Sequence, residues 1–410
     1  MLGIKFLCKK RESGTQQNAE KKSYEYAAHT PSYHKMRLRE RGLRYILYRM
    51  KKAAVKTFGI LTSGGDAPGL NAAIRGVART AIEKYGMRVI GIKNGYRGLM
   101  QGDCFELGPD DVSGILTRGG TILGTSREKP FKNAERDPAT GLTAVESIKR
   151  TYKTLGLDAL VVIGGNGTNT TGALLYEEGL NVIGLPKTID NDLVGTDITF
   201  GFHTAVSVAT EAIDRLHSTA HSHNRIMIIE VMGHKAGWLA LYAGVSGGGD
   251  VILIPEIPYK IQTIAKHLQK RKEAGKNFSI VVVAEGALSK TEDDMNKKDF
   301  KQNRKTMPRS IAYRVADELE DATGLESRVT VLGYVQRGGT PSAYDRLLAT
   351  QFGVQAAYML ARGEFGRMAA IVNGKLSSVP LKKVAGKIKA VPMNDSVLLC
   401  GKDAGTCFGD

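Results

Sequence analysis

Three clusters of glycine and polar residues each follow a run of apolar residues. Residues 63–71 read SGGDAPGLN, residues 164–168 read GGNGT, and residues 186–192 read PKTIDND. Paired glycines let backbone N–H groups approach a phosphate closely, and a helix N-terminus behind them favours negative charge. The first two clusters therefore predict phosphate binding, although an ordinary tight turn between a strand and a helix would explain residues 63–71 equally well.

The second cluster adds hydrogen-bonding side chains, Asn166 and Thr168, to its three glycines. Two glycine-rich loops that follow two strands are consistent with one phosphoryl donor whose phosphates lie across both. The chain contains no GxxxxGK[ST] sequence, which excludes a P-loop as the donor site.

The third cluster could supply a general base. A kinase that acts on an alcohol needs a carboxylate within hydrogen-bonding reach of the hydroxyl, to accept its proton during phosphoryl transfer. Asp190 or Asp192 could serve. The alternative is that both are loop residues that cap the next helix, which suits Asp192 better than Asp190.

These clusters need a scaffold of strands and helices, and the apolar runs predict one. Runs without polar alternation are typical of strands covered on both faces, hence of parallel sheets in a doubly wound α/β fold. This number of strands indicates two sheets and two domains with a boundary near residue 200. The predicted strands are residues 58–62, 88–92, 159–163, 181–185, 225–230, 251–255, 278–284 and 329–333. Ligands bind beyond the carboxyl ends of such strands, where the three clusters lie.

Length and composition restrict the class of protein. A chain of 410 residues with 42% hydrophobic residues can bury one large core or two of ordinary size. Its longest apolar runs stop after about five residues, whereas a membrane span needs about eighteen. The four cysteines have no zinc-ligand spacing and suit reduced thiols. We expect a soluble, cytoplasmic protein that does not bind a membrane.

The net charge of +17 is concentrated at one end of the chain. Residues 1–55 hold fourteen Lys or Arg against four Glu. We interpret residues 1–50 as a disordered basic extension upstream of a natural start at Met50, with an Arg-rich targeting peptide as the alternative. A nucleic-acid-binding function is disfavoured, because no interleaving of aromatic and basic residues accompanies the charge.

The clusters also stand in an order that resembles the phosphofructokinase family of bacterial type. Further matching sequences are VMG at 231–233, AEG at 284–286 and GYVQRGG at 333–339, and the resemblance covers about residues 56–370. It implies phosphorylation of the 1-hydroxyl of fructose 6-phosphate to fructose 1,6-bisphosphate in glycolysis, with ATP as donor and Mg²⁺ as cofactor. It also implies a homo-oligomer, usually a tetramer.

The resemblance implies roles for individual residues. Asp190 matches the general base, with Arg127 and Thr188 also catalytic. The donor-binding positions are Gly65, Arg127, Gly165, Asn166, Gly167 and Thr168, with Asn166 at the metal position. The fructose 6-phosphate positions are Thr188, Ile189, Asp190, Arg225, Met232, Gly233, His234, Glu285, Arg328, Tyr334, Val335, Gln336 and Arg337. In the family, some of these arginines come from a neighbouring subunit. The match at Arg225 therefore implies that this chain forms a homo-oligomer.

We expect a donor-binding domain at 51–201 with about 336–384, and a fructose 6-phosphate-binding domain at 202–335 with about 385–410. Among the residues that differ from the usual family pattern or vary within it, three bear on the metal ion and the phosphoryl donor. Asn166 stands where the family usually has Asp, which lowers the expected affinity for magnesium and leaves a non-catalytic sugar-phosphate sensor as an alternative. Gly167 leaves room for the nucleotide of ATP, whereas Lys187 is typical of diphosphate-dependent members. We favour ATP because bulk at 167 would exclude adenosine directly, with diphosphate as the alternative donor.

Overall fold

The computed structural model describes residues 54–132, 134–223, 225–306 and 310–410, and residues 53–410 form one compact unit. The predicted disordered extension at 1–50 lies outside the described residues. Among the residues that the structure describes, no helix has the length and apolar character needed to cross a membrane.

The first sheet has seven strands in the order β11-β10-β5-β4-β1-β2-β3. Its inner strands are parallel, and β3 and β11 pair antiparallel at the two edges. The inner strands are largely buried because helices cover both faces. The bounds are β1 Thr57–Ser63, β2 Arg88–Ile92, β3 Cys104–Glu106, β4 Ala159–Gly164, β5 Val182–Pro186, β10 Arg367–Val372 and β11 Lys375–Pro380.

The second sheet has four parallel strands in the order β7-β8-β6-β9. The bounds are β6 Ile226–Val231, β7 Val251–Leu253, β8 Ser279–Ala284 and β9 Ser327–Val331. All eight strands expected from the apolar runs are therefore present, and the predicted α/β architecture with mainly parallel sheets is confirmed. The sequence did not predict β3, β10 or β11.

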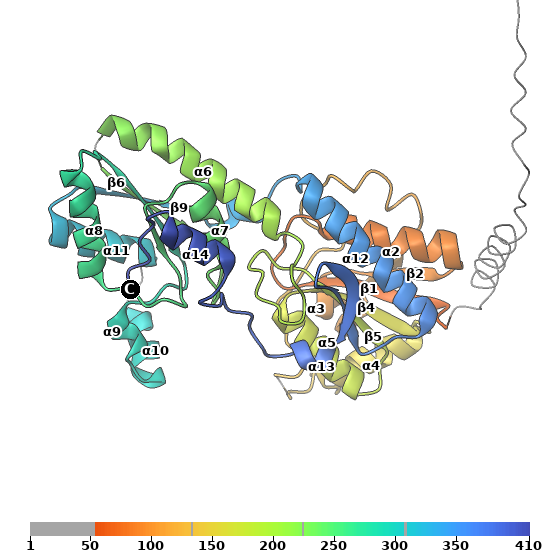
Figure 1. Ribbon diagram of the computed structural model, residues 1–410. Helices are drawn as coiled ribbons and strands as arrows, with labels where there is room; N and C mark the ends of the chain where they lie inside the picture. Colours follow the sequence, from red (N-terminus) through yellow and green to blue (C-terminus); the bar gives the residue numbers. More distant parts are fainter. Residues whose placement is uncertain (1–53, 133, 224, 307–309) are drawn as a thin grey trace, which may run out of the picture. The chain divides into compact units, whose positions relative to one another are not determined.

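Helices cover both faces of the first sheet (Figure 1). Alternate strand residues pack against α2 and α12 on one face and against α3, α4, α5 and α13 on the other. The helices α2 and α12 approach closely at Gly76. A Cβ atom at this residue would lie 2.9 Å from the carbonyl oxygen of Thr350. The bounds are α2 Leu70–Tyr85, α3 Gly95–Gln101, α4 Ala144–Thr154, α5 Asn166–Glu177, α12 Ala343–Arg362 and α13 Leu381–Val384.

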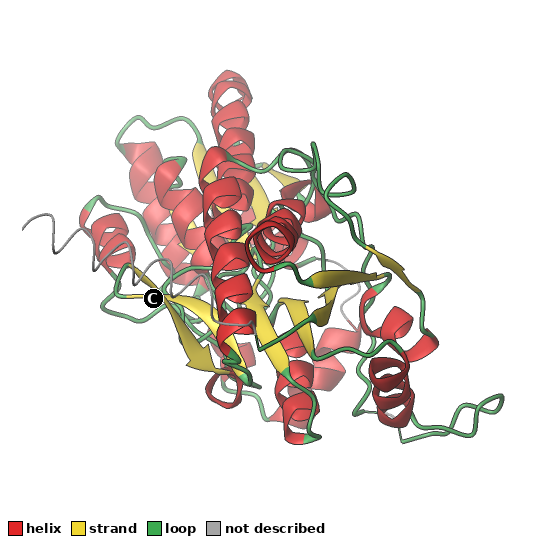
Figure 2. Cartoon of the chain, turned by 90° about the vertical axis from the view of Figure 1, so that its right-hand side faces the viewer, coloured by secondary structure: helices red, strands yellow, loops and turns green. Residues whose placement is uncertain are grey.

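The second sheet is layered in the same way, and Figure 2 shows the strands of the chain lying among the helices. One face packs against α6, α7 and α14, and the other against α8 and α11. The bounds are α6 Phe202–His223, α7 Trp238–Ser246, α8 Ile261–Glu273, α9 Lys290–Asp293, α10 Lys297–Thr306, α11 Ile311–Thr323 and α14 Ser396–Asp403, with a 3₁₀ helix η1 at Gly333–Gln336.

A buried carboxylate connects α12 to the start of α6. Asp345 is fully buried and accepts hydrogen bonds from the backbone N–H groups of Gly201 at 2.9 Å and Thr204 at 2.7 Å. Because these donors stand at the N-terminus of α6, the carboxylate satisfies groups that would otherwise lack an intrahelical partner.

Candidate functional site

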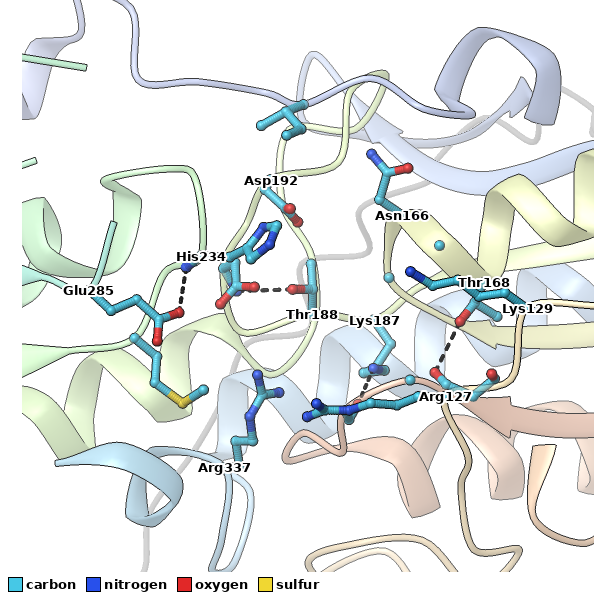
Figure 3. Close-up of a pocket in the computed structure, with 18 of the residues that line it drawn as sticks. Arg127, Lys129, Asn166, Thr168, Lys187, Thr188, Asp192, His234, Glu285 and Arg337 are labelled. Carbon is cyan, nitrogen blue, oxygen red and sulfur yellow. Dashed lines mark hydrogen bonds between the residues drawn. The ribbon is translucent and has the colours of Figure 1, made fainter. Parts of the chain in front are cut away.

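A pocket of about 760 Å³ lies beyond the carboxyl ends of strands from both sheets (Figure 3). It brings together all three clusters that the sequence singled out. The predicted site residues that line it are Gly65, Arg127, Gly165, Asn166, Gly167, Thr168, Thr188, Asp190, Met232, His234, Glu285, Tyr334 and Arg337. The other lining residues are Ser63, Gly64, Glu128, Lys129, Lys187, Asp192, Gly386 and Ile388.

The side of the pocket where the sequence predicts the donor is built on β1 and the N-terminus of α5. Gly165 caps α5 without a side-chain hydrogen bond, so the N–H groups of the first turn are available to an anion. The hydroxyl of Thr168 donates to the carbonyl of Ser63 at 3.1 Å, and the hydroxyl of Tyr96 donates to the carbonyl of Thr168 at 2.9 Å. These bonds hold the helix start against the end of β1.

The space around Gly167 is open. A Cβ atom added there would have no heavy atom within 4 Å, and the residue lines the pocket. Open space at this position agrees with the expectation that a glycine leaves room for a nucleotide.

Asp190 occupies a loop that is held by its own hydrogen bonds. Its backbone N–H donates to the hydroxyl of Thr188 at 3.1 Å, and Thr199 donates to the carbonyl of Thr188 at 2.8 Å and to Oδ1 of Asn191 at 3.1 Å. The Oδ1 atom of Asp190 is buried and has no protein partner. Burial, with the charge of Asp192 as a smaller cause, raises the pKa of Asp190 to about 7.

Lys187 is almost fully buried, with 3% of its surface exposed. Its ammonium group donates to the carbonyl of Gly65. Burial lowers the pKa of Lys187 to about 8, and the positive charge of Arg337 acts in the same direction. Figure 3 shows Arg127, Lys187 and Arg337 along one side of the pocket, so this side is suited to binding an anion.

The opposite side of the pocket comes from loops that follow β6 and β8. The backbone N–H of His234 donates to Oε1 of Glu285 at 2.8 Å, and His234 has a φ of 53°. The backbone N–H of Met232 donates to Oε1 of Gln336 at 3.2 Å. Gln336 is fully buried and does not line the pocket, and its Nε2 donates to the carbonyl of Gly333 at 3.1 Å.

Five further predicted residues do not line the pocket. Ile189 is fully buried in the core, Gly233 and Val335 flank lining residues, and Val335 is exposed. Arg225 and Arg328 lie together elsewhere, near the amino ends of β6 and β9, and both contact the carboxylate of Glu326. Those ends are opposite to the pocket, so neither arginine completes the pocket of its own chain.

The side chain of Asn166 is turned toward residues 386 and 387. Its Oδ1 accepts hydrogen bonds from the N–H of Gly386 and from the hydroxyl of Thr170, each at 3.1 Å, and its Nδ2 donates to the carbonyl of Lys387. The carboxamide oxygen would have to release one of these bonds to bind a metal ion.

The described residues contain no group of three or more His, Cys, Asp or Glu that could hold a metal ion. The pocket nevertheless fits a magnesium ion that a donor brings with its own phosphates. Asp190 and Asp192 line it, and one oxygen of Asp190 lacks a partner. Magnesium is commonly bound by one or two carboxylates together with substrate phosphates.

The sequence reasoning missed four lining residues: Glu128, Lys129, Gly386 and Ile388. Glu128 and Lys129 directly follow Arg127 in the sequence, so the prediction of Arg127 as a site residue was a signal that could have identified them. Gly386 and Ile388 follow α13 and belong to no motif, and only the tertiary fold brings them to the pocket.

Comparison with known proteins identifies the family. A profile of the phosphofructokinase family matches residues 57–360. The chain is 62% identical to a protein of Spirochaeta thermophila named ATP-dependent 6-phosphofructokinase, over 88% of this chain and all of that protein.

Two solved structures are also similar. Phosphofructokinase from Saccharomyces cerevisiae has a TM-score of 0.69 and 34% identity, over 80% of this chain and 45% of the yeast chain, so the present chain spans less than half of that one. A pyrophosphate-dependent phosphofructokinase from Marinobacter aquaeolei has a TM-score of 0.69 and 22% identity, over 87% and 92% of the two chains, and shares the fold. The chain belongs to the phosphofructokinase family.

Proposed function

We propose that this chain is an ATP-dependent 6-phosphofructokinase, which transfers a phosphoryl group from ATP to the 1-hydroxyl of fructose 6-phosphate in glycolysis. The observation that carries the proposal is the buried, unpartnered Oδ1 of Asp190 in a pocket that also holds the N-terminus of α5 and Arg127. The name of the Spirochaeta thermophila relative supports the same activity.

In this mechanism Asp190 is the general base. The hydroxyl oxygen of the sugar attacks the terminal phosphorus of ATP while its proton passes to the carboxylate. The bond from that phosphorus to the bridging oxygen breaks, and its electron pair leaves with ADP. A pKa of about 7 suits a base at neutral pH, because about half of the Asp190 carboxyl groups are ionised there and the carboxylate accepts a proton readily.

The donor would be held by positive charge and backbone N–H groups. We assign Arg127 and the start of α5, formed by Gly165, Gly167 and Thr168, to the phosphates of ATP, with Gly65 beside them. Arg127 would offset charge that develops on the transferring group. Magnesium would neutralise donor phosphates when bound, with Asp192 as the carboxylate next to the base.

The acceptor would lie on the side formed by Thr188, Met232, His234 and Glu285. Arg337 and Tyr334 also line the pocket, and a guanidinium group can bind a phosphate through two hydrogen bonds. Arg225 and Arg328 would serve the pocket of a neighbouring subunit, because both lie at the far ends of their strands. We therefore propose a homo-oligomer, with a tetramer expected.

We also propose that the chain works as two domains, at 51–201 with 336–384 and at 202–335 with 385–410, in the cytoplasm. The sheet topology supports this division, because β10, β11 and α13 return to the first sheet and α14 packs with the second.

Lys187 is the observation that favours a second donor, since its ammonium group lines the pocket and could bind diphosphate. The test is the formation of fructose 1,6-bisphosphate by the purified chain with Mg²⁺ and either ATP or diphosphate at matched concentrations. Turnover with ATP alone is expected. Turnover with diphosphate alone would overturn the donor assignment, and turnover with neither would overturn the activity.

A further inference from the structure

Residues 385–391 follow α13 in the segment that leads to α14, and they pass along the pocket. We call them the linker. Leu381 and Val384 of α13 pack in a core of the first sheet, and Leu398 of α14 packs in a core of the second. Two linker residues, Gly386 and Ile388, line the pocket. The path of the linker therefore decides where one pocket wall lies.

One end of the linker is held by α5. The N–H of Gly386 donates to Oδ1 of Asn166 at 3.1 Å and to Oγ1 of Thr170 at 3.0 Å. The carbonyl of Lys387 accepts from Nδ2 of Asn166. Gly386 has a φ of 72°, a conformation that favours glycine. Asn166 thus binds two consecutive linker residues with both ends of one carboxamide.

The other end of the linker is held by the loop that carries the base. The backbone N–H of Lys389 donates to the carbonyl of Asp192 at 2.8 Å, and its Nζ donates to Oδ1 of Asn191 at 3.2 Å. The carbonyl of Lys389 accepts from the indole N–H of Trp238 at 2.8 Å. The linker is therefore fixed at this end to α7 as well as to the loop.

The chemistry of the Asn166 contact requires a carboxamide. It accepts from one linker group and donates to the next, whereas an ionised carboxylate can only accept. A carboxylate at this position would face the carbonyl oxygen of Lys387, would repel it, and would leave it to bind water instead.

We propose that Asn166 is a positioning residue, whose carboxamide fastens the linker to the start of α5 so that Gly386 and Ile388 form a wall of the donor part of the pocket. The identity of the donor rests on the proposed function, but the fastening does not. The alternative is that Asn166 binds the magnesium ion directly, which would require its oxygen to leave Gly386 or Thr170.

The substitution Asn166→Asp separates the two assignments, because it removes the donor to Lys387 and adds a negative charge that a metal ligand would use. Thr170→Val removes the second acceptor for Gly386 without altering a residue that lines the pocket. Asn181→Asp is the matched control, since Asn181 also donates from Nδ2 to a backbone carbonyl, that of Asp158, at 2.8 Å.

The first readout is hydrogen exchange of peptides that cover residues 384–392 in the ligand-free, full-length chain. We expect exchange at the linker to be faster by about tenfold in N166D, to be faster by a smaller factor in T170V, and to be unchanged in N181D. Unchanged exchange in both N166D and T170V would overturn the fastening, whether or not the protein is a phosphofructokinase.

The second readout is the Michaelis constant for each substrate. N166D should raise KM for ATP by about tenfold and change KM for fructose 6-phosphate by less than about twofold. A lower KM for ATP, or a lower magnesium requirement, in N166D would overturn the proposal in favour of direct metal binding. If N166D does not fold, the same two readouts in T170V decide.

Discussion

The guanidinium group of Arg337 packs against Gly65, so closely that a Cβ atom at residue 65 would lie 2.7 Å from Nη1. The same Nη1 donates to the carbonyl of Asp66 at 2.9 Å. Gly65 follows β1 and Arg337 follows η1, so this contact joins the proposed donor side of the pocket to the proposed sugar-phosphate side.

Gly65→Ala should therefore impair both sides. The added methyl group displaces the guanidinium of Arg337, which we assign to the sugar phosphate, and disturbs the backbone beside the donor. We expect kcat/KM for each substrate to fall by about tenfold in steady-state assays. Gly108→Ala is the control, because a Cβ atom there meets only Oδ2 of Asp111, at 3.5 Å; an equal loss in both variants would contradict the explanation.

The pKa of Asp190 predicts the acidic limb of the pH profile. A general base must be ionised, and Asp190 is protonated below about pH 7 in the ligand-free protein because of its burial. The value of kcat/KM for fructose 6-phosphate, measured at saturating ATP, should be constant above that pH and fall by about tenfold per pH unit below it. A profile that stays flat down to pH 5 would exclude Asp190 as the base.

The raised pKa also predicts a stability cost. The folded state binds the proton of Asp190 more tightly than the unfolded state, whose pKa is near the ordinary 3.8. The contribution of Asp190 to the free energy of unfolding is therefore fully present below pH 3.8, the pKa of the unfolded state. It is lost as the pH rises through about 7, the pKa of the folded state. In thermal melts Asp190→Asn should raise Tm by about 2–4 °C at pH 8 and by little at pH 4; the opposite trend would contradict the assignment.

The lowered pKa of Lys187 predicts that KM for ATP depends on pH in the basic range. Its pKa of about 8 means that the ammonium group loses its charge above that pH, which weakens attraction to donor phosphates. KM for ATP should rise above pH 8 in the wild type, and Lys187→Met should raise it at neutral pH and remove its dependence on pH in this range. A basic limb that survives in K187M would assign it to another group.

Arg225 and Arg328 allow a test of whether each active site is formed by residues of two subunits. Each variant, R225A or D190N, should lose most activity alone. Refolding the two chains together should restore activity, because the pocket of an R225A chain keeps Asp190 and can receive Arg225 from its partner. Both arginines contact Glu326, so one chain supplies both, and a mixture of R225A with R328A should stay inactive. No recovery in the first mixture would contradict shared sites.

The sequence predicted the strands that carry the pocket because each is a continuous apolar run between turn residues, as β4 and β8 illustrate. It missed β11, Lys375–Pro380, because an exposed edge strand needs no apolar run. It missed β10, which contains two alanines and so has a weak strand preference.

The predicted site was most complete where residues follow a strand directly, as Gly65, Asp190 and Glu285 do. The linker could not be predicted, because Gly386 and Ile388 reach the pocket only through the tertiary fold, as in the hydrogen bond between Gly386 and Asn166, which are 220 positions apart. The sequence also could not reveal that the carboxamide of Asn166 is already engaged by the protein.

The most direct test of the central claim compares Asp190→Asn with the wild type in the formation of fructose 1,6-bisphosphate from ATP and fructose 6-phosphate, with calorimetry of ATP binding alongside. If Asp190 is the general base, kcat should fall by about 100-fold or more while the affinity for ATP changes only a few-fold. A D190N enzyme with a kcat close to that of the wild type would contradict the claim.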